Sequence, residues 1–216
     1  MRIVCIGYRD WALRIYSRLQ HSVEHEVIIV KSDKKLDYGL LYSLGPDLVL
    51  FYGWSWTIPV EILKQFKCLM LHPSDLPKFR GGSPIQNQIL SGVNKSKITI
   101  FQMTEEIDAG PIIIQKPIDL SGSMIEIFTQ MENLGLEATL AFLADGITYT
   151  QQNDDQATYH KRRTPAESEI TWDEFKTSSA RQIHDKIRSL QDPYPNAFIR
   201  MADGSKLILK QSQVED

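Results

Sequence analysis

The hydrophobic and polar positions of the chain alternate between two patterns. Short apolar runs rich in β-branched residues predict buried strands, and segments with apolar residues every three or four positions predict amphipathic helices. The strands are expected at residues 2–8, 25–32, 46–53, 68–72, 97–104 and 110–120. The helices are expected at residues 11–19, 34–44, 58–66, 83–92 and 123–146. This alternation predicts an α/β domain with a mainly parallel sheet flanked by helices.

The last part of the chain has a different pattern. Residues 150–168 are polar and irregular, which favours a boundary in this segment. A further helix and two short strands are expected after it, at residues 175–191 and 196–210. Asp203 and Gly204 between the two strands predict a hairpin turn. We therefore expect a core of residues 1–165 and a C-terminal extension, a helix plus a β-hairpin, of residues 166–216.

Composition and charge restrict the class of protein. A chain of 216 residues with ordinary globular composition can bury roughly 70% of its unfolded surface in one core. The net charge of −3 gives no general attraction for polyanions, so we expect no nucleic-acid partner. The N-terminal apolar run is too short for a signal peptide or a membrane span, which favours a cytoplasmic protein with no membrane partner. Cys5 and Cys68 lie in apolar runs and are expected to act as small buried hydrophobes.

The segments that follow the predicted strands are the expected place for a ligand. Ligands of such sheets bind beyond the carboxyl ends of the strands, and the segments there are residues 7–10, 52–56 and 72–77. His72 ends an apolar run, and Pro73 and Pro77 restrict the backbone after it, which would hold a catalytic side chain in place. The alternative is a histidine that only caps the strand.

The same loop continues with residues suited to a ligand. Gly81 and Gly82 permit close backbone approach to a ligand, and Arg80 is placed to hold an anion or a carboxylate. The helix that follows is expected to be capped by Ser83, with Pro84 at its first position.

Asp108 is the carboxylate that could pair with His72. It lies in an acidic turn between two predicted strands, 36 residues after the histidine (108 − 72 = 36), and neighbouring strand ends could bring the two together. A carboxylate beside an imidazole raises the basicity of the ring and selects its tautomer. The alternative is a solvated acidic loop.

Other motifs carry less information. G-x-G-x-x-G, G-x-S-x-G and H-E-x-x-H are absent, which argues against a dinucleotide fingerprint, an α/β-hydrolase serine and a zincin zinc site. The aromatic run at residues 51–56 could flank a flat heterocycle or form a partly buried strand end. The basic run at residues 160–164 could meet phosphates or be solvated.

These residues resemble the formyltransferase family that uses N10-formyltetrahydrofolate. LHPSDLPKFRGGSPIQNQILSG is similar to the family's H-P-S-x-L-P-x-x-R-G-x-x-P-I motif, and EEIDAGPII is similar to its D-x-G-x-I motif. RRTPAESEITW and IRSLQDPYPNAF resemble segments beyond the core of enzymes that formylate nucleotide-linked amino sugars. The resemblance covers most of the chain. It implies a Rossmann-like formyltransferase fold with a catalytic core at residues 1–165, and catalytic roles for His72 and Asp108.

The chain departs from the family pattern two residues before the histidine. The family has an asparagine there, and this sequence has Met70. A thioether cannot donate a hydrogen bond to an oxyanion, and the loss of one oxyanion donor typically lowers turnover by about 10²- to 10³-fold. Gln86 and Asn87 carry the nearest amides in sequence, and the helix phase leaves open whether either reaches the site.

The resemblance also implies roles for other residues. An acceptor amine attacks the formyl carbon of the folate; His72 stabilises the oxyanion or moves the proton, and Asp108 orients the histidine and helps to deprotonate the amine. No metal is implied. The residues expected at the folate are Tyr52, Gly53, Trp54, Thr104, Glu105, Glu106 and Ile107. The residues expected at the acceptor are Arg9, Ser74, Lys78, Arg80, Gly81, Gly82 and Arg162.

Several acceptors are compatible with the resemblance. The C-terminal motifs favour a nucleotide-linked (UDP or dTDP) 4-amino-4,6-dideoxy sugar in the synthesis of cell-surface glycan precursors, with the tail hairpin pairing two subunits into a homodimer. Methionyl-tRNA formyltransferases carry a further C-terminal β-barrel and bind a polyanion. A glycinamide ribonucleotide-type or other small-amine acceptor, a catalytically weakened folate or nucleotide-sugar binding protein, and a hydrolase that transfers the formyl group to water are the alternatives.

Overall fold

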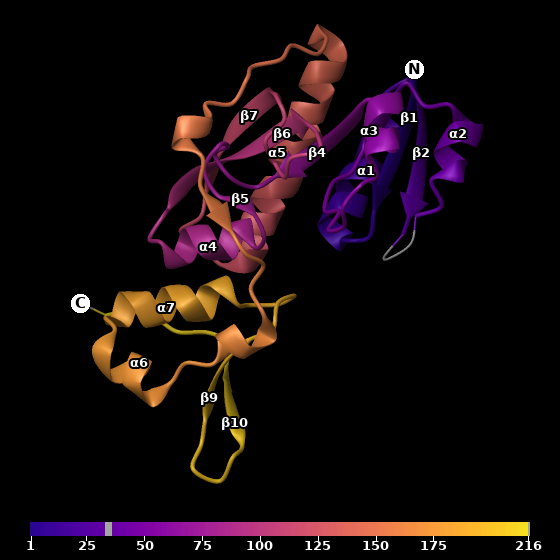
Figure 1. The fold of residues 1–216 in the computed structure, drawn as a ribbon. Coiled ribbons are helices and arrows are strands. Elements are labelled where there is room, and N and C mark those ends of the chain that lie inside the picture. Colours follow the sequence, from indigo (N-terminus) through magenta and orange to yellow (C-terminus); the bar gives the residue numbers. More distant parts are fainter. Residues whose placement is uncertain (33–35, 216) are drawn as a thin grey trace.

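The computed structural model describes residues 1–32 and 36–215 and shows an α/β core with a smaller C-terminal part (Figure 1). The core contains a six-stranded sheet in the order β2-β1-β3-β4-β6-β7. Its strands are β1 (Arg2–Gly7), β2 (Glu26–Lys31), β3 (Leu48–Leu50), β4 (Cys68–His72), β6 (Lys95–Gln102) and β7 (Ile112–Asp119). The first four are parallel, whereas β6 is antiparallel to β4 and β7 is antiparallel to β6. The predicted fold class, a mainly parallel sheet flanked by helices, is confirmed.

Apolar side chains cover both faces of the sheet because successive residues of a strand point to opposite sides. Ile3 and Cys5 of β1 belong to one apolar cluster, and Val4 and Ile6 belong to a second one. The helices of the core are α1 (Asp10–Ser22), α2 (Gly39–Leu44), α3 (Val60–Gln65), α4 (Pro84–Leu90) and α5 (Met124–Asp145). All overlap segments predicted to be helical, with α1 longer than the expected 11–19, and the start of the helix expected at 34–44 falls outside the described residues. No described helix is both long and apolar enough to cross a membrane.

The direction of β6 decides where the loop at residues 103–111 begins. Leu69 pairs with Gln102 and His72 pairs with Thr99, so β6 ends beside the start of β4 and not beside its carboxyl end. The loop that carries Asp108 therefore folds back along β4 to bring its carboxylate within 3.5 Å of the His72 ring. The expected proximity is confirmed, but the expected reason, neighbouring strand ends, is wrong.

The C-terminal part contains helices and a hairpin (Figure 1). Its elements are α6 (Trp172–Thr177), α7 (Ala180–Ser189), β9 (Ala197–Arg200) and β10 (Lys206–Leu209). The single helix expected over residues 175–191 is wrong. Ser179 starts a new helix, because its side chain accepts the backbone N–H of Gln182 while the Gln182 side chain accepts the backbone N–H of Ser179. The hairpin is confirmed, with β9 antiparallel to β10.

The polar segment between these two parts returns to the core. It contains a 3₁₀ turn, η1 (Asp154–Gln156), and the two-residue strand β8 (Tyr159–His160). Strand β8 pairs in parallel with β5 (Arg80–Gly81), which follows the His72 loop. A second turn, η2 (Pro165–Ser168), leads into the C-terminal part, where α7 packs against α4. The segment expected to form a boundary therefore also lies against the loop that carries the candidate site.

Candidate active site

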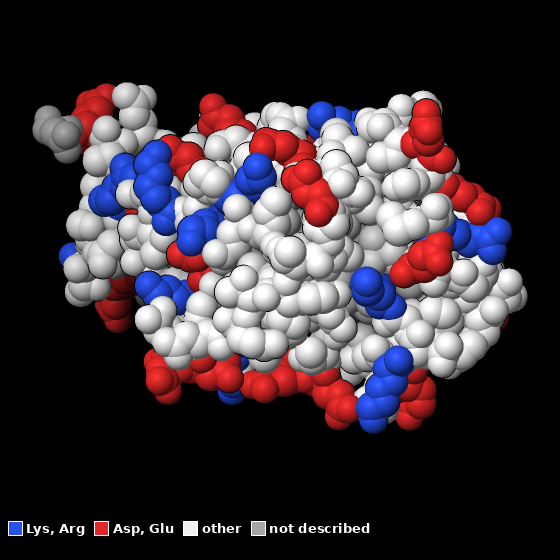
Figure 2. All heavy atoms as spheres, turned by 90° about the horizontal axis from the view of Figure 1, so that it is seen from above, with Lys and Arg blue, Asp and Glu red and all other residues white. Residues whose placement is uncertain are grey.

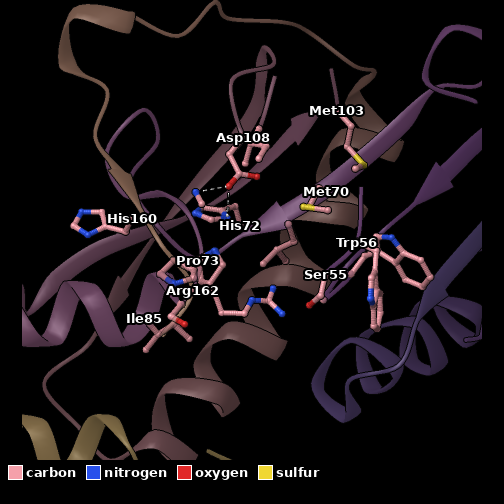
Figure 3. Close-up of a pocket in the computed structure, with 18 of the residues that line it drawn as sticks. Ser55, Trp56, Met70, His72, Pro73, Ile85, Met103, Asp108, His160 and Arg162 are labelled. Atoms are coloured by element: carbon pink, nitrogen blue, oxygen red, sulfur yellow. Dashed lines mark hydrogen bonds and ion pairs between the residues drawn. The ribbon is translucent and has the colours of Figure 1, made fainter. Parts of the chain in front are cut away.

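A cavity of about 600 Å³ lies at the carboxyl ends of the parallel strands (Figure 3). Its walls come from the segments after β1, β3 and β4, from the loop at 103–111, and from residues 160–163. Its volume is within the range of about 300–1,000 Å³ that is usual for small-molecule sites. In Figure 3, His72 and Asp108 lie together, and Met70 lies between them and Trp56. The strand-end rule therefore located the cavity correctly.

His72 is held by the backbone of its own loop. The side chain is 6% exposed, and its Nε2 lies 2.8 Å from the carbonyl oxygen of Phe79. A carbonyl oxygen only accepts hydrogen bonds, so Nε2 carries a proton. The other ring nitrogen, Nδ1, faces Oδ2 of Asp108 at 3.5 Å. The Phe79 carbonyl thus leaves Nδ1 as the nitrogen that can take up a proton, beside a carboxylate that would stabilise the charged ring.

Asp108 is held in an unusual backbone conformation. Its φ of 54° lies in the left-handed region, which few residues other than glycine adopt. Its side chain is 10% exposed, and Oδ2 accepts the backbone N–H of Gly81 at 2.7 Å. That bond aims the carboxylate at the histidine. The side chain is not the solvated acid of the alternative reading.

The glycines of the loop allow a close backbone approach that the sequence did not indicate. A Cβ at Gly81 would lie 2.4 Å from the carbonyl oxygen of His160, and a Cβ at Gly82 would lie 2.3 Å from the backbone of Arg162. Gly81 also has a φ of 94°. Both glycines are therefore required by the close approach of the 160–162 segment. Because both also line the cavity, they bring that segment to its wall.

Most of the residues predicted at the folate and at the acceptor do line the cavity. Those on the folate list are Gly53, Trp54, Thr104, Glu105, Glu106 and Ile107. Those on the acceptor list are Arg9, Gly81, Gly82 and Arg162. The structure thus brings ten of the predicted binding residues around His72 and Asp108.

Four predicted residues lie outside the cavity, because their side chains are used within the fold or point to solvent. Tyr52 is fully buried, and its hydroxyl bonds to Oγ1 of Thr139 at 2.9 Å. Ser74 is also fully buried, and its Oγ donates to the carbonyl oxygen of Lys78, whose own side chain is exposed. Arg80 is 1% exposed and bonds to the polar segment before β8 and to β8 itself. The predicted ligand contacts of these four residues are therefore corrected. Tyr52, Ser74 and Arg80 have structural roles, and the side chain of Lys78 is exposed to solvent.

Sequence reasoning missed other lining residues. Met103, Phe128 and Tyr194 contribute side chains to the wall, and Tyr194 comes from the C-terminal part. Burial of Tyr194 raises the pKa of its hydroxyl. The PYPNAF motif, which contains Tyr194, is the one sequence signal that could have indicated this residue. Ser83 stands at the N-cap of α4 with Pro84 in the first turn, as expected, but its Oγ makes no cap bond with the helix and instead accepts the backbone N–H of Arg163 at 3.1 Å.

The two amides left open by the sequence have different surroundings. Asn87 donates to the carbonyl oxygen of Gly82 at 2.8 Å and does not line the cavity. Gln86 does line it, is 3% exposed, and has an Oε1 with no hydrogen-bond partner among the described residues. Gln86 is therefore the amide that can contact a ligand.

Neither cysteine lines this cavity. Cys5 and Cys68 are buried and unpaired, as expected, and burial raises the pKa of Cys68 to about 12. Within residues 1–32 and 36–215, no three His, Cys, Asp or Glu side chains are grouped so that they could hold a metal ion. His72 and Asp108 are the histidine and carboxylate that meet on the wall of the cavity, 3.5 Å apart between Nδ1 and Oδ2.

Comparison with known proteins identifies relatives of both parts of the chain. The family model "Formyl transferase" matches residues 31–133, and the model "Formyl transferase, C-terminal domain" matches residues 163–216. A methionyl-tRNA formyltransferase of Rickettsia felis is 32% identical over 195 residues, which is 85% of this chain and 62% of that protein. The chain therefore spans less than two thirds of the length of the curated relatives it matches.

Solved structures with the same fold extend the similarity. A methionyl-tRNA formyltransferase from Clostridium thermocellum has a TM-score of 0.84 and 29% identity, over 96% of each chain. A 4-N formyltransferase from Francisella tularensis has a TM-score of 0.79 over 100% of this chain and 98% of its own, at 19% identity, and thus shows the fold alone. The matches to both family models and the shared fold lead to one conclusion. This chain belongs to the formyltransferase family.

Proposed function

We propose that this chain transfers a formyl group from N10-formyltetrahydrofolate to the amino group of an acceptor. The observation that supports this most strongly is the buried His72 and Asp108 pair, 3.5 Å apart on the wall of a cavity in a member of the formyltransferase family. Transfer of a formyl group to an amine requires a proton to leave the attacking nitrogen. An imidazole and a carboxylate held together provide a place for that proton.

His72 and Asp108 are the proposed catalytic residues. The acceptor nitrogen bonds to the formyl carbon, the bond from that carbon to folate N10 breaks, and one proton moves from the acceptor nitrogen to N10. The pair takes up that proton on the way, with Nδ1 of His72 as the ring nitrogen left free by the Phe79 carbonyl. Asp108 stabilises the charged ring, so the proton is held beside the cavity until it is returned.

The folate is proposed to bind at Gly53, Trp54 and residues 104–107. The indole rings of Trp54 and Trp56 pack edge to face with their centroids 4.9 Å apart, and both line the cavity. Trp56 is 37% exposed and offers a flat surface for a pterin, and the buried Nε1 of Trp54 has no hydrogen-bond partner among the described residues. Bound there, N10-formyltetrahydrofolate would supply the activated formyl group. A HypX protein from Aquifex aeolicus, solved in complex with tetrahydrofolic acid, shares the fold at 22% identity and a TM-score of 0.78 over 96% of this chain and 37% of its own.

The proposed acceptor is a nucleotide-linked 4-amino-4,6-dideoxy sugar, carried by UDP or dTDP, for cell-surface glycan precursors. Arg9 and Arg162 line the cavity, and guanidinium groups suit a diphosphate. Lys and Arg are interspersed with Asp and Glu on the face in Figure 2, which does not favour a polyanion. Methionyl-tRNA is the second candidate, supported by the 32% identity.

The acceptor can be identified by supplying several candidates. The protein is incubated with N10-formyltetrahydrofolate and, separately, with UDP- and dTDP-linked amino sugars, glycinamide ribonucleotide and methionyl-tRNA. A mass gain of one formyl group on an amino sugar is expected. A gain only on methionyl-tRNA or glycinamide ribonucleotide would replace the sugar as the acceptor. Tight folate binding without any product would indicate a binding protein, and release of formate without an acceptor would indicate a hydrolase.

Replacing Met70 with asparagine is expected to preserve turnover or to raise it, by up to about tenfold. Met70 lies in β4 and lines the cavity together with Met103, and an amide there adds a donor that a thioether lacks. The measurement is kcat with the acceptor found above, and Met70→Leu is the matched control without a donor. A folded but inactive Met70→Asn protein would show that this site no longer uses the family's arrangement.

A homodimer paired through the hairpin is also proposed. Leu207 and Ile208 of β10 are exposed, although both are apolar. Sedimentation or light scattering is expected to give a dimer mass for the wild-type chain and a monomer mass for Leu207→Asp or Ile208→Asp. Gln211→Asp, at an exposed position just beyond β10, is the control for added charge. A wild-type protein that stays monomeric at high concentration would refute the pairing.

A further inference from the structure

The loop that carries Asp108 has little hydrogen bonding of its own. The N–H of Ala109 reaches the carbonyl oxygen of Glu106 only at 3.5 Å, and Glu106 and Ile107 are exposed. At the same time, Asp108 has a positive φ, which is unfavourable for a residue with a Cβ. Such a conformation persists only where surrounding groups hold it.

Gln152 provides that support from the polar segment. Its Nε2 donates to the carbonyl oxygen of Asp108 at 2.9 Å and to that of Gly110 at 2.7 Å. The two carbonyls can only accept, so the amide nitrogen has to face the loop and Oε1 has to face away. One amide group thus spans the backbone on both sides of Ala109.

Arg80 fixes the orientation of that amide. Its Nε and Nη2 donate to Oε1 of Gln152 at 3.1 and 2.8 Å, and a guanidinium has no atom that could accept instead. Nη2 also pairs with Asp154 at 2.6 Å, which balances the charge of a side chain that is 1% exposed. Gln152 cannot turn its amide over without losing the bonds to both Arg80 and the loop.

A second line of bonds runs from the same guanidinium to the loop. Nη1 of Arg80 donates to the hydroxyl of Tyr159 at 2.6 Å, and that hydroxyl donates to Oε1 of Glu106 at 2.7 Å. The next residue of β5, Gly81, donates its N–H to the Asp108 carboxylate at 2.7 Å. Strand β5 therefore holds the loop backbone through Arg80 and the carboxylate itself through Gly81.

We propose that Arg80 and Gln152 are positioning residues, which hold the 106–110 loop so that the Asp108 carboxylate faces Nδ1 of His72. Neither side chain lines the cavity, so both act through the loop and not on a ligand. The effect on turnover rests on the proposed function, whereas the effect on the loop does not.

Gln152→Glu tests this placement. A glutamate has nearly the same shape and can still accept both bonds from Arg80, but it has no N–H for the carbonyl oxygens of Asp108 and Gly110. Amide hydrogen exchange at residues 108–110 is expected to rise by about tenfold or more. The ¹⁵N and ¹H shifts of the His72 ring are expected to change, and kcat is expected to fall by about 10²-fold, more than KM rises.

Gln191→Glu is the matched control, because Gln191 also joins two backbone groups through its amide. Its Nε2 donates to the carbonyl oxygen of Lys210 at 3.2 Å and its Oε1 accepts the N–H of Met124 at 3.0 Å, away from the cavity. Loop exchange, ring shifts and kcat are expected to stay at wild-type values in this variant. Wild-type loop exchange and His72 shifts in Gln152→Glu would overturn the proposal. Because both measurements are made without substrate, they decide it even if no acceptor is formylated.

Discussion

Replacing His72 with alanine is expected to lower kcat for formyl transfer by about 10²- to 10⁴-fold, the range usual for loss of a general acid or base. The ring donates from Nε2 to the Phe79 carbonyl and presents Nδ1 to Asp108, so its removal deletes the proposed proton acceptor. The measurement is kcat with the acceptor found in the panel, together with a thermal unfolding curve that shows the variant is folded.

A second histidine provides the control for the substitution. His184 lies on α7 and bonds through Nδ1 to Oγ of Ser212 at 2.9 Å, outside the cavity. His184→Ala is expected to keep wild-type kcat. Near-normal turnover in His72→Ala would remove His72 from the mechanism while leaving family membership untouched.

Asp108→Asn is expected to lower kcat by a similar factor, about 10²- to 10⁴-fold. The asparagine keeps the shape of the side chain, and its carbonyl oxygen can still accept the N–H of Gly81, now 2.7 Å from Oδ2. It has no negative charge to stabilise a protonated ring at 3.5 Å. Asp108→Asn therefore tests the charge of the side chain and not its packing. The measurement is kcat at a fixed pH with saturating N10-formyltetrahydrofolate.

The matched control replaces an aspartate of similar local bonding away from the cavity. Asp203 in the hairpin turn accepts the backbone N–H of Ser205 at 2.9 Å, as Asp108 accepts that of Gly81. Asp203→Asn is expected to leave kcat unchanged. If Asp108→Asn kept most of its activity, the carboxylate would be only a structural partner of Gly81, and His72 would have to act without it.

Local sequence signals located the elements of the core and the candidate residues. The sequence predicts a strand at residues 68–72, which are the observed bounds of β4. The first four of these residues are apolar, and His72 ends the apolar run. The helix boundary at Ser179 was also readable, since Ser179 and Gln182 form a capping box, but the apolar spacing on both sides suggested one helix. The prediction of a single helix was wrong because it followed the apolar spacing and not the capping box.

Contacts between residues far apart in the chain determined the roles of Arg80 and Tyr52, which local sequence patterns could not assign. Arg80 follows the His72 loop and has a charge suited to an anion, yet its contacts come from Gln152, Asp154 and Tyr159, more than seventy residues later. Nothing in the local pattern shows that a polar, irregular segment returns to pair as β8 with β5. Tyr52 was misassigned for the same reason, because its partner Thr139 lies on α5.

The sequence by itself determined the α/β class, the place of His72 at a strand end, and the carboxylate at Asp108, because strand period, turn residues and motif spacing are local properties. Only the tertiary structure decided that β6 runs antiparallel to β4, so that the Asp108 loop has to fold back, and that Arg80 and Gln152 support it from behind. Strand direction and burial depend on contacts between distant segments. A side chain's chemistry gives its candidate roles, and the packing around it selects among them.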